Sequence, residues 1–403
     1  MTLRLVMMCV CVLLAVGCAQ AAARPWKLDH ILVTFWCPPP ATDENLAAVA
    51  AEHYTMTWVP VEGLDVAARH GLRAMLTDGL LNPATLDDPA QKAKLDALVD
   101  RVKGHPAMYA YFLRDEPSAS DFPGLGRLVA YLRERDPAHL AYINLFPTYA
   151  NNEQLGTKGD TLAAYSEHLR QFIEVVKPGL ISYDHYHFFK DRDGDQYFLN
   201  LGMIRNAAFG AGLPFLNIIQ ASTVVESWRL PDAREMRWLV YTTLAYGGRG
   251  ISYFTYWGPA SYGGLYQDGK RMPLALKVAE LNAEINVLSP ELMALDSLGA
   301  YHTAPLPWGA EAVPADSPVQ IAGSGEFVLG LFGTGGQMTA FMVVNRDYRR
   351  SAAAHVRLPA DARGLQEFDR ARKAWQGYAG PDASGAATIA LQPGDGRLFR
   401  LIR

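Results

Sequence analysis

The sequence contains few cysteines and little excess charge. Three of its four cysteines, Cys9, Cys11 and Cys18, fall within the first 18 residues, which leaves only Cys37 in the remainder of the 403-residue chain. One isolated thiol excludes a disulfide framework, and after an apolar strand it is typical of a small core or rim residue. The formal net charge of −4 argues against nucleic acid as a partner. Internal repeats, low-complexity tracts and blocks of like charge are also absent.

The longest apolar run lies at the N-terminus. It extends over Leu5–Val16 after a single cation, Arg4, and is too short to span a bilayer. The stretch that follows, 15–19, reads Ala-Val-Gly-Cys-Ala and resembles a bacterial lipobox, in which the cysteine (Cys18) is lipidated. The alanines after it also offer sites for ordinary secretory cleavage. Both alternatives predict export from a bacterial cell, either lipid-anchored in the envelope or periplasmic or secreted.

Hydrophobic strands and helical stretches alternate along most of the chain. This pattern favours a parallel α/β architecture, and 50% hydrophobic residues allow a large core. Because no glycine-rich phosphate fingerprint follows the first strand, we prefer a (β/α)8 barrel to a doubly wound sheet. The expected strands are Ile31–Trp36, Thr55–Pro60, Leu72–Thr77, Ala110–Arg114, Ala141–Phe146, Ile181–Tyr186, Phe215–Gln220 and Gly250–Trp257.

The composition changes near residue 298. Helical periodicity ends, prolines crowd a connecting stretch, and short alternating runs separated by Gly, Pro and Asp turns follow. Such runs are typical of an antiparallel β-sandwich. We therefore expect a leader over 1–23, a (β/α)8 barrel over 24–297 and a small β-sandwich domain over 298–403.

Polar and aromatic residues close the predicted strands. In a (β/α)8 barrel the active site forms at these C-terminal strand ends. The fourth strand runs from Tyr109 directly into Asp115, Glu116 and Pro117, so two carboxylates leave the sheet edge together. Carboxylates, amides and flat aromatic faces on one rim suit a polyhydroxylated ligand. The other candidate residues at strand ends are Trp36, Asp78, Asn144, Asp184, His185, Gln220, Tyr256 and Trp257.

These strand ends resemble the retaining clan of (β/α)8 glycoside hydrolases that includes β-galactosidases and cellulases. In that clan the fourth strand ends in Asn-Glu-Pro and the eighth often ends in a substrate-stacking Trp. Glu116, Pro117 and Trp257 match these positions. The resemblance implies a glycosidase that acts on an oligo- or polysaccharide without a cofactor, with Glu116 as general acid.

The sequence departs from the clan at two positions. Asp115 replaces the clan's Asn, and Gln220 stands where the clan has its nucleophilic Glu. An amide cannot supply the negative charge that the second catalytic group requires. We expect Asp184 to attack the anomeric carbon or activate a water, with Glu226 and Asp78 as alternatives, while the charge of Asp115 raises the pKa of Glu116. Loss of the usual nucleophile favours inversion over retention.

Two other interpretations stay open. A non-catalytic carbohydrate-binding lipoprotein on a degenerate hydrolase barrel would also explain Gln220. The pair formed by His185 and His187 raises a metal-dependent hydrolase, but no matching histidines occur on the other strands, so we expect no metal. The acidic stretch 191–195 resembles a calcium loop but lacks the later bidentate Glu. The sequence does not decide the oligomeric state.

Overall fold

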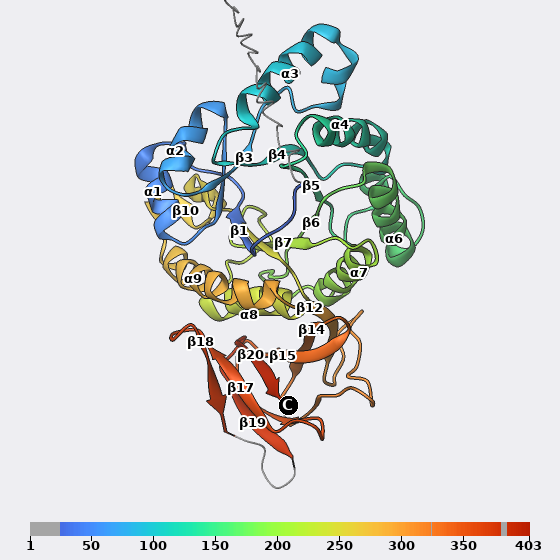
Figure 1. Cartoon of the computed structure of the whole chain (residues 1–403), viewed down its shortest axis with the longest axis vertical. Coiled ribbons are helices and arrows are strands. Elements are labelled where there is room, and N and C mark those ends of the chain that lie inside the picture. The colour runs from blue at the N-terminus through green and yellow to red at the C-terminus, as the bar shows by residue number, and fades with distance from the viewer. Residues whose placement is uncertain (1–24, 324, 380–384) are drawn as a thin grey trace, which may run out of the picture.

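The computed structural model describes residues 25–323, 325–379 and 385–403 (Figure 1). The expected leader and Cys18 lie outside the described residues. Two bodies are visible: a barrel of alternating strands and helices, and a smaller β-domain packed against one side of it. None of the helices in the described ranges is both long and apolar enough to cross a membrane.

A parallel eight-stranded sheet forms the barrel. Its strands follow the order β1-β8-β7-β6-β5-β4-β3-β2, so the first strand pairs with the last and the sheet curls back on itself. This confirms the predicted (β/α)8 fold. The strands are β1 (Leu32–Phe35), β2 (Met56–Val59), β3 (Arg73–Leu76), β4 (Met108–Asp115), β5 (Leu140–Leu145), β6 (Ile181–His185), β7 (Phe215–Gln220) and β8 (Gly250–Phe254).

A threonine joins the remaining seam, between β1 and β2. The backbone N–H of Thr55 donates to the carbonyl oxygen of Val33 (2.9 Å), and its Oγ1 accepts from the N–H of Val33 (2.9 Å). Because these contacts pair backbone groups that would otherwise be orphaned inside the barrel, the side chain takes the place of a ladder bond. The barrel is thereby closed around its interior.

The helices bury one apolar face each against the outside of the sheet. In α4, the residues at helical spacing, Leu125, Leu128, Val129 and Leu132, are all buried. Asp232 caps α8 and forms a reciprocal capping box with Glu235, which fixes where that helix begins. The α-helices are α1 (Asp43–Ala51), α2 (Leu64–Arg69), α3 (Pro89–Val102), α4 (Phe122–Arg135), α5 (Asn152–Leu155), α6 (Thr161–Gln171), α7 (Tyr197–Gly210), α8 (Ala233–Ala245) and α9 (Pro273–Met293).

Aromatic side chains fill the upper part of the barrel interior. Trp58 packs 4.7 Å, centroid to centroid, from both Trp36 and Phe112, and Tyr142 lies 6.3 Å from Phe112. Tilted and edge-on aromatic contacts of this kind hold ring orientations firmly. These rings pack together beneath the C-terminal ends of the strands.

The C-terminal part forms two packed antiparallel sheets, which confirms the predicted β-sandwich. The sheet orders are β12-β14-β15-β20-β17-β18 and β13-β16-β19, and the expected boundary at residue 298 lies within β12. The strands are β12 (Asp296–His302), β13 (Gln320–Ala322), β14 (Phe327–Thr334), β15 (Gln337–Asn345), β16 (Ala352–Arg357), β17 (Gly364–Asp369), β18 (Ala374–Tyr378), β19 (Ala386–Leu391) and β20 (Gly396–Ile402).

The sandwich docks on α8. Strand β14 approaches the helix so closely that a Cβ at Gly330 would lie 2.3 Å from the carbonyl oxygen of Ala245. Beside this contact, Glu284 of α9 accepts from Arg237 at 2.7 Å and from Arg370 of the sandwich at 2.9 Å. Close backbone packing and charge-assisted hydrogen bonds therefore join the two bodies.

We expect Gly330→Ala to lower the free energy of unfolding by about 2 kcal/mol, because the added methyl group cannot fit between β14 and α8. Urea unfolding followed by circular dichroism would measure this loss. Gly377→Ala is the matched control, since no atom lies within 4 Å of the Cβ position there. Equal stabilities for the two variants would contradict the proposed close docking.

Candidate active site

A cavity of about 280 Å³ lies at the C-terminal ends of the barrel strands. Its walls combine carboxyl groups, one amide and aromatic rings, the composition expected from the strand ends. The lining residues are Trp36, Asp115, Glu116, Asn144, Tyr149, Asp184, Tyr186, Val224, Val225, Trp228 and Phe254. Both predicted catalytic residues are thus in one cavity, together with Trp36, Asp115 and Asn144.

The backbone at the end of β4 takes an unusual conformation. Glu116 follows the last residue of the strand with φ +43°, in the left-handed region that non-glycine residues rarely adopt. Its N–H donates to the carbonyl oxygen of Asn144 at 2.9 Å, which holds the turn in place. Strained residues of this kind persist where the surroundings fix them and gather at functional sites. Asp115 and Glu116 consequently both line the same cavity.

Asn144, on β5, connects a carboxyl group on each of the two strands that flank β5, namely β4 and β6. Its Nδ2 donates to Asp184 Oδ1 at 2.9 Å and to Asp115 Oδ1 at 3.1 Å. Its Oδ1 accepts from the Ser182 hydroxyl at 3.0 Å, and that hydroxyl lies 2.7 Å from the hydroxyl of Tyr142. Because both ends of the amide are engaged, its orientation is fixed with the two N–H groups toward the carboxylates.

Glu116 and Asp184 form a hydrogen-bonded carboxyl pair. Asp184 is only 3% exposed, and its burial, followed by the negative charge of Glu116, raises its pKa well above the usual range. Burial, followed by the charge of Asp115, raises the pKa of Glu116 to about 7. Two carboxyls in contact cannot both ionise easily. At neutral pH the pair therefore keeps a proton, which Asp184 donates to Glu116.

This contact changes the roles that we expect for the two carboxyl groups. A two-carboxylate glycosidase holds these groups about 5–5.5 Å or about 6.5–9.5 Å apart, with the sugar or a water between them. Glu116 and Asp184 instead share a side-chain hydrogen bond. While this bond is made, no sugar or water lies between the two groups, and Asp184 is the proton-sharing partner of Glu116.

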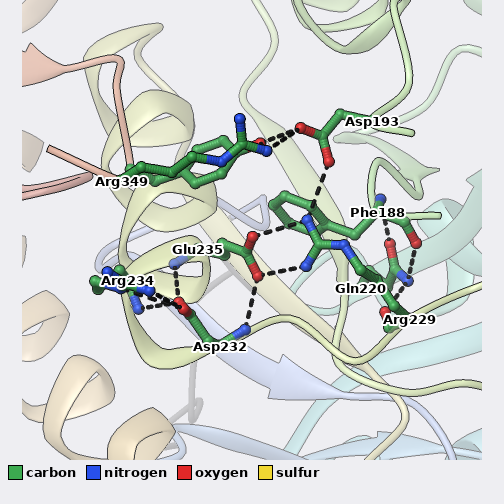
Figure 2. A network of polar contacts seen from close by, with 9 residues as sticks. Phe188, Asp193, Gln220, Arg229, Asp232, Arg234, Glu235 and Arg349 are labelled. Carbon is green, nitrogen blue, oxygen red and sulfur yellow. Dashed lines mark hydrogen bonds and ion pairs between the residues drawn. The ribbon is translucent and has the colours of Figure 1, made fainter. Parts of the chain in front are cut away.

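Two residues that were predicted to contact a ligand instead form hydrogen bonds within the protein. Gln220 is fully buried, and its amide exchanges hydrogen bonds with both backbone groups of Phe188 and donates to the carbonyl oxygen of Arg229, at 2.8–2.9 Å (Figure 2). His185 is buried behind the cavity, with Nδ1 2.9 Å from Asn200 Oδ1. Neither residue lines the cavity, because each side chain satisfies buried polar groups of the loops.

Three further predicted residues also lie outside the cavity lining. Asp78 accepts from the N–H of Leu80 at 2.8 Å, the turn role that its Asp-Gly sequence also fits. The Tyr256 hydroxyl donates to the buried carboxylate of Glu52 at 3.0 Å. Trp257 stacks on Tyr266. Both belong to a small sheet within the segment between β8 and α9, which consists of β9 (Trp257–Gly258), β10 (Tyr266–Gln267) and β11 (Lys270–Arg271). Phe254, at the end of β8, lines the cavity instead.

Most of the aromatic residues that line the cavity were not predicted from the sequence. Tyr186 and Phe254 directly follow or end a strand, so their position was a usable signal. Val224, Val225 and Trp228 come from the β7–α8 loop, and nothing in their sequence marks them as cavity residues. Tyr186 lies 4.4 Å from Trp228 and 5.3 Å from Phe254, measured between ring centroids, which makes one continuous aromatic surface.

An ion network fixes the loop that carries this wall (Figure 2). The Arg229 guanidinium binds both oxygens of Glu235 at 2.7 and 2.8 Å and Asp193 at 3.0 Å. Asp193 also accepts from Tyr348 and from Arg349 (3.1 Å) of the sandwich domain. Bidentate guanidinium–carboxylate pairs are geometrically specific. Trp228, next to Arg229, is therefore held against the cavity by contacts that reach the C-terminal domain.

No arrangement for a metal occurs within the described ranges. No group of three or more His, Cys, Asp or Glu side chains there could hold an ion. In the stretch that resembled a calcium loop, Asp193 is paired with Arg229, and Glu226, the alternative second carboxylate, is exposed and does not line the cavity.

The fold is that of the (β/α)8 glycoside hydrolases. No family model matches the sequence, and no curated protein matches it. Among solved structures, the chain is similar to a family 39 glycoside hydrolase from the gut symbiont Bacteroides cellulosilyticus WH2, at 9% identity and TM-score 0.52 over 92% of this chain and 81% of that one. A family 51 α-L-arabinofuranosidase from Bifidobacterium longum gives 11% identity and TM-score 0.45 over 92% of each chain. At these identities the likeness defines the fold alone.

We expect Gln220→Glu to destabilise the protein by about 3 kcal/mol at pH 8 rather than to create a nucleophile. The new carboxylate would face two carbonyl oxygens that now accept from the amide. Protonation restores one donor, so the loss should shrink at pH 5. Urea unfolding at both pH values measures it, with the exposed Gln376→Glu as control. A stable variant with new hydrolytic activity would show that this assignment is wrong.

The carboxyl pair should also make the wild type less stable as pH rises. The pKa of Glu116 is raised to about 7 in the folded state from 4.5, so the folded state binds the proton more tightly. Stability is therefore complete below about pH 4.5 and declines until about pH 7, by about 3 kcal/mol from this group. Glu116→Gln should remove that decline and exceed the wild type in stability at pH 8. The exposed Glu153→Gln should not; identical pH profiles for all three proteins would refute the raised pKa.

Proposed function

We propose that the protein is a glycoside hydrolase that cleaves O-glycosidic bonds of an oligo- or polysaccharide, with Glu116 as general acid. The observation that carries the proposal is the Glu116–Asp184 pair inside an aromatic-walled cavity at the C-terminal ends of the strands. The pair holds one proton at neutral pH, and a carboxyl group whose pKa lies near 7 can take up that proton and give it to a leaving oxygen. Aromatic walls suit the apolar face of a sugar ring.

Each group in the cavity then has a distinct task. Glu116 gives its proton to the glycosidic oxygen as the bond to the anomeric carbon breaks. The proton that Glu116 gives reaches it from Asp184 as Glu116 turns to the substrate, so Asp184 is left as a carboxylate that stabilises the positive charge developing at the anomeric carbon. Water supplies a hydroxyl group to that carbon and a proton that restores Glu116. Asn144 is a positioning residue, because it holds Asp184 and Asp115 through one amide.

Gln220 supports a second candidate function. At the position of the clan's nucleophile this chain has an amide that forms hydrogen bonds with the backbone of a loop. This arrangement fits a barrel that binds carbohydrate without cleaving it. Retention of a buried, proton-sharing carboxyl pair supports the enzyme instead. A structural role alone would not favour burying Asp184 beside another acid, since such burial destabilises the fold.

We also propose that the protein is exported. The apolar run Leu5–Val16 and the lipobox-like position of Cys18 support this proposal, and they leave lipid anchoring and free secretion as alternatives. An exported location would give the enzyme access to polysaccharides outside the cytoplasm.

Hydrolysis of a panel of aryl glycosides and plant or microbial polysaccharides tests the function. Glu116→Gln should lower kcat by about 10²–10⁴-fold on substrates that need leaving-group protonation, and wild-type activity should fall above about pH 7 as Glu116 ionises. Asp184→Asn should also lose activity, whereas Glu153→Gln should not. Undiminished activity in Glu116→Gln would end the assignment. A wild type that binds a glycan but cleaves none of the panel would establish the binding protein.

A further inference from the structure

The cavity carries acid without a compensating base. Asp115, Glu116 and Asp184 line it, yet no Lys, Arg or His is among its lining residues. Arg114 precedes Asp115 in β4; its exposed side chain forms no salt bridge with the three carboxyls among the residues described, and its charge only partly offsets the burial that raises the pKa of Asp115. Although the Glu116–Asp184 pair keeps one proton, the remaining negative charge of the cavity repels sugars that bear carboxylate, sulfate or phosphate groups and attracts a cation.

Asp115 is the carboxyl that is open to a ligand. Asp184 is buried and engaged by Asn144 and Glu116, whereas Asp115 is exposed at the cavity wall. Its Oδ1 accepts the single weak bond from Asn144 at 3.1 Å, and Oδ2 has no hydrogen-bond partner among the described residues. An ammonium group would bring three donors and the opposite charge to this side chain.

The aromatic rings of the cavity also favour a cationic ligand. Tyr186, Trp228 and Phe254 form a continuous surface on one side, and Trp36, which directly follows β1, also lines the cavity. Ring faces attract cations through their quadrupole, and aromatic side chains are used in this way to enclose ammonium groups. Two independent features of the cavity, its charge and its rings, therefore agree.

We infer that the sugar unit bound in this cavity carries a protonated amino group and that Asp115 is its specificity-determining contact. This inference rests on the proposed function, because it takes the cavity as the sugar site. It narrows the substrate to a glycan that contains hexosamine units with free amines, as opposed to neutral, N-acetylated or acidic units.

Binding of four monosaccharides by isothermal titration calorimetry tests the inference: glucosamine, glucose, N-acetylglucosamine and glucuronic acid. Wild-type protein should bind glucosamine at least about tenfold more tightly than glucose, as expected for one charge-assisted contact, and should not bind glucuronic acid. Asp115→Asn should reduce the preference for glucosamine to within about threefold. Asp316→Asn, an exposed position in the C-terminal part, should retain the full preference. The comparison of sugars on the wild type needs no variant to fold.

The outcomes separate this inference from the proposed function. Equal binding of glucose and glucosamine, tight binding of glucuronic acid, no binding of any of the four sugars, or a preference that survives Asp115→Asn would overturn the inference. If neutral glycosides are then cleaved in a Glu116-dependent manner, the proposed hydrolase still stands. If glucosamine is bound through Asp115 but no glycoside, including chitosan oligosaccharides, is cleaved, the inference stands and the hydrolase falls.

Discussion

The burial of Asp184 without a cation is the constraint on which the rest of the site depends. A carboxylate that leaves water must be paired, hydrogen-bonded or protonated, or it destabilises the fold. Here the amide of Asn144 supplies one donor and Glu116 shares the proton. The orientation of Asn144 depends in turn on Ser182 and Tyr142 below it. One buried acid thereby influences the protonation of its neighbour and takes part in a side-chain network that joins β4, β5 and β6.

The walls of the cavity depend on a different kind of interaction. The loops after β6 and β7 are joined by Gln220 and by the ion pair of Arg229 with Asp193, and the sandwich domain joins this network through Arg349. These contacts lie away from the carboxyl pair, but they position Trp228 and the apolar loop beside it. The C-terminal domain is therefore part of what shapes the site, although its strands do not line the cavity.

The sequence allowed the fold and the centre of the site to be predicted. Strand ends converge in any closed parallel barrel, so Asp115, Glu116, Asn144 and Asp184 could be placed together from their positions alone. The same reasoning misplaced Gln220 and His185. A strand-end position fixes where the backbone of a residue lies, but the direction of its side chain depends on which buried polar groups nearby lack a partner.

By itself the sequence determined the alternation of strands and helices, the sandwich that follows and the adjacent acids at the end of β4, because these depend on local hydrophobic patterns and chain order. The tertiary structure alone decided that Glu116 and Asp184 touch and share a proton, since their contact joins strands that are 68 positions apart in the chain. It also decided that Trp228 faces the cavity and that, within the part of the chain that the structure describes, no Lys, Arg or His lines it. Side-chain contacts between distant segments set protonation and charge balance, and no local pattern encodes them.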